Sequence, residues 1–503
     1  MRSHRLIALG WVTLLVLSLW LRFDGLDSNP IHADEATGAR ILAQQLEGEP
    51  YRFNPKHFHG PLLSTISSAI AGFRNETSWN ELRLMTLRIG PALAGVLIVL
   101  TPLLCVRFLG HGGALTAGAF LASSPLLVYY NRIYIHESIL CLLGMLALLG
   151  VFRLLTKPTI LAGALAGLWI GLMFATKETF AISVIAWSLA GSLCLCAPQL
   201  RPTQTLRRYL GPLMTLALIA FLASGYCYTH GFTQLAGLRD AYSTFFIYET
   251  TPGHQKEWYY YLHLLLWPKQ TLGLWWTELS ITLFALIALT GAFLKRDHAA
   301  VSLLFVVLSA LIHLLIYSLI SYKTPWLMLL PWAHLCLAGG AAFAFVNKMT
   351  PVLRLCGLLA LVSALAYQTT QSLYATGSYA NDARNPYAYV PTTRDPQTFA
   401  NWLQQIESLP DAPEMEPIGV IGSEYWPLPW YLRSFETIGY WPAPPDTIAQ
   451  FPVVFAMPAQ VAACDNLLEK SHIKLPRSLR SNISISLYLR HDLWNLWMEN
   501  PEP

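Results

Sequence analysis

Long apolar runs, separated by short polar segments, fill the chain from its start to about residue 376. Most runs are close to the 20 residues that a helix needs to cross the hydrocarbon core of a bilayer. About eleven spans are expected, at residues 6–21, 86–106, 112–130, 136–154, 159–176, 179–197, 209–229, 272–294, 299–321, 325–346 and 352–374. The pattern predicts a polytopic α-helical membrane protein whose transmembrane module covers residues 1–376.

The pattern changes in the tail, residues 377–503. Short apolar runs at 418–421, 453–456 and 483–487 alternate with helical stretches such as 398–408, which is typical of a small α/β domain. The aromatic residues of this tail fit two alternatives, stacking on sugar rings or packing the domain against the membrane: Trp426, Trp430, Tyr431, Trp441, Trp494 and Trp497.

Charge sets the expected topology. With 54% hydrophobic and 12% charged residues, the composition excludes a soluble globular enzyme. Lysines and arginines gather in alternate loops, for example at 153–157, 201–208 and 295–296, so the positive-inside rule places the N-terminus in the cytoplasm. The first loop (22–85), the turns at 130–136, 176–179 and 321–325, the loop 230–271 and the tail are then extracytoplasmic.

A multi-pass protein of the inner or plasma membrane is expected. The small net charge of +4 gives no indication of a nucleic-acid partner.

The acidic pair Asp34-Glu35 follows directly on the first span. Carboxylates at a membrane surface are costly and usually functional. The first loop also contains two amphipathic stretches, 35–42 and 62–66, which are expected to be helices lying in the interface.

Between these stretches stand Lys56, His57 and His59. Two histidines two residues apart can face one ion only in an extended segment, so a divalent metal site recruiting Asp34, Glu35 or His136 is one alternative. A cationic or hydrogen-bonding surface is the other.

The turn at 130–136 adds Arg132, His136 and Glu137 to the same face. An Arg132–Glu137 ion pair that closes the turn is an alternative to a functional role. Lys177 and Glu178 present the same choice between the next two spans.

Lys323 stands between two long apolar spans and has no acidic neighbour in the sequence. Its expected partner is therefore an anion supplied by another molecule.

Carboxylates suited to be general bases and cations suited to hold a phosphate thus share one face of the membrane. This combination suits group transfer from a lipid-linked phosphate. A lipid-linked sugar flippase or transporter also needs many spans and charges, but it tends to show inverted repeats, which are not evident here. A noncatalytic sugar- or lipid-binding subunit is the other alternative.

The chain resembles the GT-C superfamily of glycosyltransferases, of the protein O-mannosyltransferase and aminoarabinose-transferase type. Asp34-Glu35 matches the acidic motif of that group's first loop. The prokaryotic branch named for an association with flippase activity is similar in three further segments, residues 59–62, 321–327 and 426–433.

The resemblance implies an inverting transfer of a sugar from a polyprenyl-phosphate donor to a hydroxyl of a glycan, lipid or protein acceptor. Asp34 would be the general base, with Glu35 orienting the acceptor or sharing charge, and Glu137 would occupy the second acidic position. Cations would meet the phosphate of the leaving group: Lys323, Arg132, Lys177 and Lys56. The remaining candidates for substrate or metal binding are His57, His59, His136 and Glu178, with a divalent metal ion left open as a cofactor.

Overall fold

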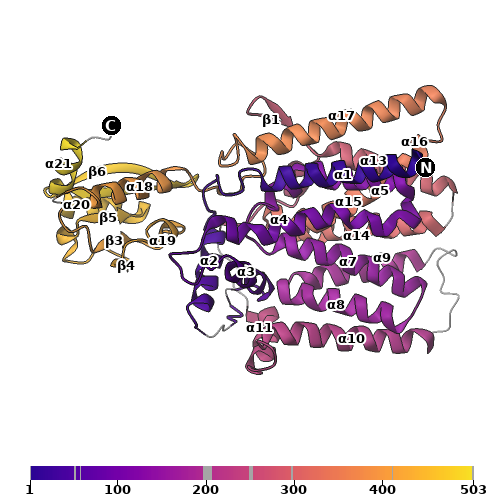
Figure 1. Cartoon of the computed structure of the whole chain (residues 1–503), viewed down its shortest axis with the longest axis horizontal. Coiled ribbons are helices and arrows are strands. Elements are labelled where there is room, and N and C mark those ends of the chain that lie inside the picture. Colours follow the sequence, from indigo (N-terminus) through magenta and orange to yellow (C-terminus); the bar gives the residue numbers. More distant parts are fainter. Residues whose placement is uncertain are drawn as a thin grey trace.

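The helical bundle expected from the hydrophobic pattern is present in the computed structural model, which describes residues 2–49, 53–56, 58–195, 207–247, 253–295, 298–410 and 412–500. Its long helices run side by side (Figure 1): α1 (Arg2–Phe23), α4 (Leu84–Leu100), α5 (Val106–Ser123), α7 (Glu137–Thr156), α8 (Ile160–Thr176), α9 (Phe180–Leu195), α10 (Arg207–Tyr228), α13 (Leu279–Lys295), α14 (His298–Leu319), α15 (Leu329–Gly340) and α17 (Pro351–Thr376).

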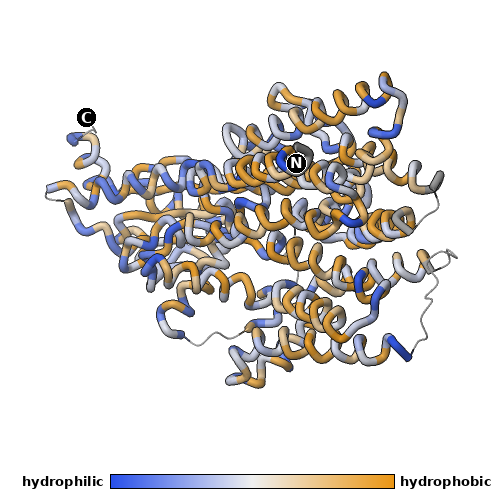
Figure 2. The backbone as a smooth tube through the Cα atoms, turned by 45° about the vertical axis from the view of Figure 1, so that its right-hand side comes forward, coloured by the Kyte–Doolittle hydropathy of each residue, from blue (hydrophilic) through white to orange (hydrophobic). Residues whose placement is uncertain are grey.

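Seven helical segments of the described residues are long and apolar enough to cross a bilayer. One of them, Leu84–Ser123, is 40 residues long and contains two of the predicted spans. Three further predicted spans correspond to shorter apolar helices, Ile160–Thr176, Phe180–Cys194 and Leu279–Ala292. The prediction of a polytopic helical membrane protein is confirmed, and Figure 2 shows the apolar residues concentrated in the bundle.

The bundle is layered around α15, every residue of which is buried. The 3₁₀ segment η3 (Pro325–Met328) precedes α15, and α16 (Ala342–Val346) follows it. By contrast, α10 and α17 are mostly uncovered by other helices, so their apolar side chains face lipid.

Two predicted spans have different limits in the structure. The expected span 112–130 ends at Ser124, whose hydroxyl accepts a hydrogen bond from Leu127 N and caps the separate helix α6 (Pro125–Tyr130). Pro125 lacks the N–H that would continue α5. On the other side, η1 (Thr101–Cys105) and a kink at Gly110, whose φ is 69°, separate α4 from the main part of α5.

The expected span 272–294 begins late because its first residues form a hairpin. β1 (Lys269–Thr271) pairs with β2 (Leu274–Trp276), and the two residues between them, Leu272 and Gly273, both have positive φ. A two-residue loop of this kind matches the twist of paired strands, so the helix begins only at Leu279.

Short helices occupy one end of the bundle, between it and the sheet region described next (Figure 1). Two of them, α2 (Ala33–Leu46) and α3 (Leu62–Phe73), come from the first loop. Two others, α11 (Ala236–Ile247) and α12 (Tyr260–Leu265), come from the loop after α10.

The tail folds around a five-stranded mixed sheet, so the expected α/β character is confirmed. The strand order is β4-β3-β5-β7-β6, where β3 is parallel to β4 and β5, and β7 is antiparallel to β5 and β6. The strands are β3 (Ile418–Ile421), β4 (Ile438–Trp441), β5 (Val453–Ala456), β6 (His472–Arg480) and β7 (Ile483–Arg490).

Helices cover both faces of this sheet. Phe399 and Leu403 of α18 (Asp395–Glu407), together with α19 (Leu428–Tyr431) and α21 (His491–Glu499), pack with Val453 and Phe455 on one face. Residues of η4 (Ile448–Gln450) and α20 (Val461–Leu468) pack on the other face, and η5 (Pro458–Gln460) leads into α20. Neighbouring strand residues therefore alternate between two cores, as a doubly covered sheet requires.

The sheet region contacts the first loop directly. The Tyr431 hydroxyl accepts a hydrogen bond from Ile31 N at 3.2 Å. The guanidinium of Arg433 lies 3.6 Å from the centre of the Trp430 ring, and Trp430 meets Trp79 edge to face. These contacts place the tail beside the residues that carry the acidic pair.

The other tail aromatics singled out from the sequence also pack against neighbours. Trp494 and Trp497 lie against Trp402, and Trp441 lies against Phe451. Packing is therefore the role that the structure shows for them.

Candidate active site

A cavity of about 270 Å³ lies where the first loop meets the loop ends of the bundle. Aromatic and small residues of α2, α3 and the 321–327 segment line part of it. Five of the residues singled out from the sequence also line it: Asp34, His59, His136, Glu137 and Lys177. Segments far apart in the sequence therefore converge on one space.

Asp34 reaches this cavity from the first turn of α2. His32 is the N-cap residue: its Nδ1 accepts from Asp34 N at 3.1 Å, and the Glu35 carboxylate accepts from His32 N at 2.8 Å. This is a capping box with histidine in the place of serine or threonine. The Asp34 side chain is 56% exposed, so its carboxylate is available to a substrate.

Glu35 points the other way, into the protein. It is fully buried, and Arg88 of α4 donates to both of its oxygens at 2.7 Å. Tyr134 N donates a further hydrogen bond at 2.7 Å. Burial alone would raise the pKa of Glu35, but the guanidinium and these donors hold it below its usual value. The expectation that Glu35 orients the acceptor or shares charge with Asp34 is corrected: Glu35 anchors α2 to α4.

Glu137 and Lys177 form an ion pair on the wall of the cavity. The Lys177 Nζ and Glu137 Oε1 atoms are 2.5 Å apart, and both side chains are almost fully buried. The alternative Arg132–Glu137 pair is not formed, because Arg132 donates to the carbonyls of Leu21, Asp24 and Gly25 and so caps the end of α1.

Glu178 pairs with His59 instead of with its neighbour Lys177. The His59 Nδ1 and Glu178 Oε2 atoms are 3.1 Å apart, and the His59 ring meets that of His136 edge to face. Burial opposes the charge of Glu178, yet His59 and Lys177 hold its pKa at about 2. In the part of the chain that the structure describes, no three His, Cys, Asp or Glu side chains form a group that could hold a metal ion.

Lys323 is buried and faces carbonyl oxygens of its own surroundings. Its Nζ donates to Lys256 O at 3.1 Å and to Ile320 O, and burial lowers its pKa. Backbone carbonyls are the partners that the structure shows for this lysine, and its expected contact with an external anion stays a prediction. Its neighbour Tyr322 lines the cavity.

The remaining cations are placed differently. Arg132 lines a separate polar cavity of about 40 Å³ together with Glu35 and Arg88 and does not line the cavity at Asp34. Its expected contact with a phosphate stays a prediction. Lys56 is exposed in the turn before α3. His57 lies outside the described residues.

Two residues close to Asp34, His32 and His254, were not predicted from the sequence. His32 was overlooked because an N-cap is usually serine, threonine or aspartate, although its position one turn before Glu35 matches the capping-box spacing. His254 and Tyr389 lie on loops far from the acidic pair, and the charge of Asp34 acts on both.

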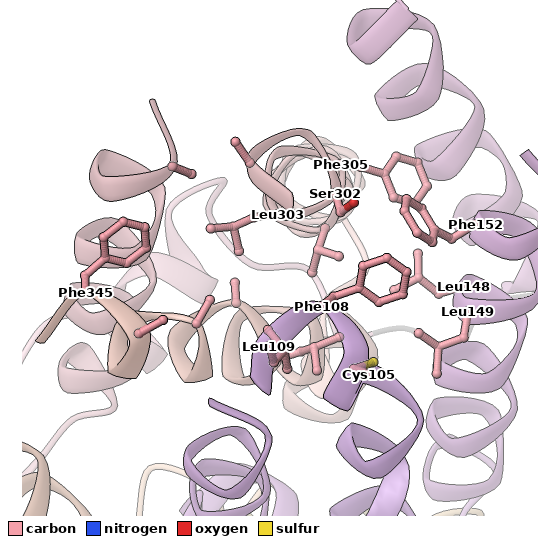
Figure 3. Close-up of a pocket in the computed structure, with 17 residues that line it drawn as sticks. Cys105, Phe108, Leu109, Leu148, Leu149, Phe152, Ser302, Leu303, Phe305 and Phe345 are labelled. Carbon is pink, nitrogen blue, oxygen red and sulfur yellow. The ribbon is translucent and has the colours of Figure 1, made fainter. Parts of the chain in front are cut away.

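An apolar cavity of about 150 Å³ lies in the half of the bundle remote from Asp34 (Figure 3). Phe108, Phe152 and Phe305 line it, with Ser302 among otherwise apolar neighbours. Among the described residues, no carboxylate, imidazole or amine lines it, so the cavity at Asp34 is the candidate active site.

Comparison with known proteins identifies the fold. The family model described as dolichyl-phosphate-mannose-protein mannosyltransferase matches residues 62–226. ArnT from Cupriavidus metallidurans in its apo state is similar with a TM-score of 0.62 and 17% identity, covering 97% of this chain and 99% of ArnT. The chain has the GT-C glycosyltransferase fold.

Two further structures share the GT-C fold. ArnT bound to undecaprenyl phosphate gives a TM-score of 0.56 at 14% identity, covering 96% of this chain and 99% of ArnT. The Archaeoglobus fulgidus oligosaccharyltransferase tethered with an acceptor peptide gives 0.58 at 13% identity, covering 98% of this chain and 77% of that enzyme. No curated protein matches the chain significantly. The GT-C resemblance expected from the sequence is confirmed.

Proposed function

We propose that this protein is an inverting glycosyltransferase that moves a sugar from a polyprenyl-phosphate donor to an acceptor hydroxyl. One observation carries the proposal: in a GT-C fold, the exposed carboxylate of Asp34 and the Glu137–Lys177 pair line the same cavity. That cavity lies beside the membrane-spanning helices, where a lipid-linked substrate can reach it.

In the proposed reaction, the acceptor oxygen attacks the anomeric carbon while the bond from that carbon to the phosphate oxygen breaks. Asp34 takes the proton of the acceptor hydroxyl and later releases it to water. A correctly placed general base contributes about 10²- to 10⁴-fold to a rate. The exposure of Asp34 fits this role, because the same carboxylate must meet both acceptor and solvent.

The departing polyprenyl phosphate gains negative charge. Lys177 is the predicted cation that lines the cavity, and Glu137 holds its ammonium in place before any substrate binds. Preorganised charges of this kind stabilise a developing anion most effectively. Lys323 stabilises the adjacent 321–323 segment through carbonyls, and Lys56 remains a candidate from the exposed turn.

The lipid nature of the donor has outside support. ArnT, which shares this fold, has been observed with undecaprenyl phosphate, and the related oligosaccharyltransferase with an acceptor peptide. The matching family model is named for a dolichyl-phosphate-mannose substrate. We therefore infer a polyprenyl-phosphate sugar as the donor class.

The test compares wild type with Asp34→Asn in detergent, using a panel of polyprenyl-phosphate sugars and measuring released polyprenyl phosphate. We expect kcat to fall at least a hundredfold in the variant with an unchanged melting temperature. Asp27→Asn is the matched control, since Asp27 is an exposed carboxylate of the same loop.

Equal turnover in Asp34→Asn and wild type would exclude Asp34 as the base. If wild type consumed no donor but moved lipid-linked sugar across vesicles, the protein would be a flippase instead. Repeating the assay with a chelator separates a metal-dependent from a metal-independent transfer.

A further inference from the structure

The segment that leads from α17 to the sheet region carries Tyr389, and this residue lies against three loops of the candidate site. Its carbonyl oxygen is 3.0 Å from His32 Nε2, and its hydroxyl is 2.7 Å from His254 Nδ1. Its ring meets Trp326 edge to face, with ring centres 5.4 Å apart. One residue thus contacts the first loop, the loop after α10 and the segment before α15.

The contact with His32 leads directly to Asp34. Because His32 Nδ1 accepts from Asp34 N, the imidazole proton resides on Nε2 and is donated to the Tyr389 carbonyl. A histidine whose two nitrogens are both engaged has a fixed tautomer and ring orientation. The first turn of α2, and with it Asp34, is therefore tied to the position of Tyr389.

The contact with His254 leads to the lysine-bearing segments. Burial lowers the pKa of His254 and so favours its neutral ring, whose Nδ1 forms the hydrogen bond with the Tyr389 hydroxyl. Lys323 N donates to His254 O at 2.9 Å, and Lys256 N donates to Ser321 O at 3.1 Å. Residues 254–256 and 321–323 therefore form one unit, which the Tyr389 hydroxyl holds.

The backbone after Tyr389 is held from the other side by the sheet region. Ser481 N donates to Pro391 O at 3.0 Å, and Thr393 N donates to Leu479 O at 3.1 Å. Between these anchors and Tyr389, Val390 has a φ of 44°. A β-branched residue in the left-handed region is strained and persists only where its surroundings fix it.

We propose that Tyr389 is a positioning residue for the transfer reaction. Its contact with His32 fixes the position of the base, Asp34, and its contact with His254 fixes the unit of residues 254–256 and 321–323. The distance between the base and this unit is thereby held constant. The sheet region thereby becomes part of the catalytic machinery, because it fixes the segment that carries Tyr389. The inference rests on the proposed function and adds to it a residue that touches neither substrate nor reacting atoms. Fixed geometry matters because small displacements of a catalytic group lower rates steeply.

Two conservative variants separate the two contacts. Asn is a good N-cap, so His32→Asn keeps α2 capped but loses the link to the Tyr389 carbonyl. Tyr389→Phe keeps the carbonyl and the ring but loses the hydroxyl. A lost hydrogen bond of about 1 kcal/mol corresponds to a five- to tenfold effect.

For His32→Asn we expect kcat to fall about five- to tenfold with an unchanged donor KM and melting temperature. For Tyr389→Phe we expect the donor KM to rise by a similar factor with a smaller change in kcat. Tyr440→Phe, an exposed tyrosine of β4, is the control and should match wild type.

Wild-type kinetics in both variants, beside an inactive Asp34→Asn, would overturn the inference and leave the proposed function standing. A fall in melting temperature that accounts for the lost kcat would also overturn it, since the role would then be structural. If wild type turns over no donor, both proposals fail together.

Discussion

At the scale of single residues, two neighbouring acids have opposite tasks. Successive helical positions point about 100° apart, so Asp34 faces the cavity while Glu35 faces Arg88. Lys177 and Glu178, which follow the end of α8 in non-helical backbone, also have different partners, Glu137 and His59. Charged residues that are adjacent in the sequence therefore contact different partners across the site.

Glu35→Gln should destabilise the protein strongly, because it leaves the buried guanidinium of Arg88 without its counter-charge. Breaking a buried pair on one side costs about 3–5 kcal/mol. The measurement is the melting temperature in detergent, with the exposed Glu49→Gln as control. A double replacement, Glu35→Gln with Arg88→Gln, should be milder than the sum of the two singles. A melting temperature within a degree of wild type for Glu35→Gln would contradict the anchoring role.

At the scale of elements, glycines determine how closely α8 and α10 approach. Gly163, Gly167 and Gly171 recur every four residues on α8, and a Cβ atom at each would lie 2.1–2.4 Å from a carbonyl oxygen of α10. Such a spacing of small residues lets helix backbones meet inside a membrane, where no hydrophobic effect drives association.

Gly167→Val should separate these helices. The added side chain meets Leu216 O, which belongs to the backbone and has little freedom to move. Overpacking of this kind costs about 1–3 kcal/mol, which a thermal melt in detergent would show. Gly72→Val on α3 is the control, because a Cβ there meets nothing within 4 Å. Equal melting temperatures for the two variants would disprove the close packing.

At the scale of the whole molecule, the candidate site is assembled between two parts of different character. The bundle supplies Glu137 and Lys177, the first loop supplies Asp34, and the segment before the sheet supplies Tyr389. The N-terminus lies at the end of the bundle remote from the sheet region (Figure 1). The sheet region and the candidate site therefore lie on the same side of the membrane.

We predict that this side is extracytoplasmic, because the basic residues Arg153 and Lys157 lie at the end of α7 opposite to Glu137. Fusing a reporter that is active only outside the cytoplasm to the C-terminus should give activity, whereas a reporter active only inside should be silent. The same two reporters, fused after residue 157 to a chain truncated in the basic loop 153–157, give the inverse control. The reverse pattern at the C-terminus would place the site in the cytoplasm.

The spans could be predicted because hydrocarbon imposes a length and an apolar composition on each helix. Their limits were harder to predict where local chemistry intervened, as at Pro125 and at the Leu272-Gly273 turn. Five of the predicted site residues do line one cavity. The resemblance implied that Asp34 is the base and that Glu35 orients the acceptor or shares charge, but of these two only Asp34 lines the cavity.

The sequence alone thus determined the class of protein, the α/β tail and the set of polar residues from which the site is built, since these depend on composition and local pattern. Only the tertiary structure decided which charge meets which. Arg88 lies 53 positions from Glu35, and Tyr389 lies 357 positions from His32. A charge buried in the protein requires a partner in space, and that partner is set by how helices and loops pack, which spacing along the chain does not encode.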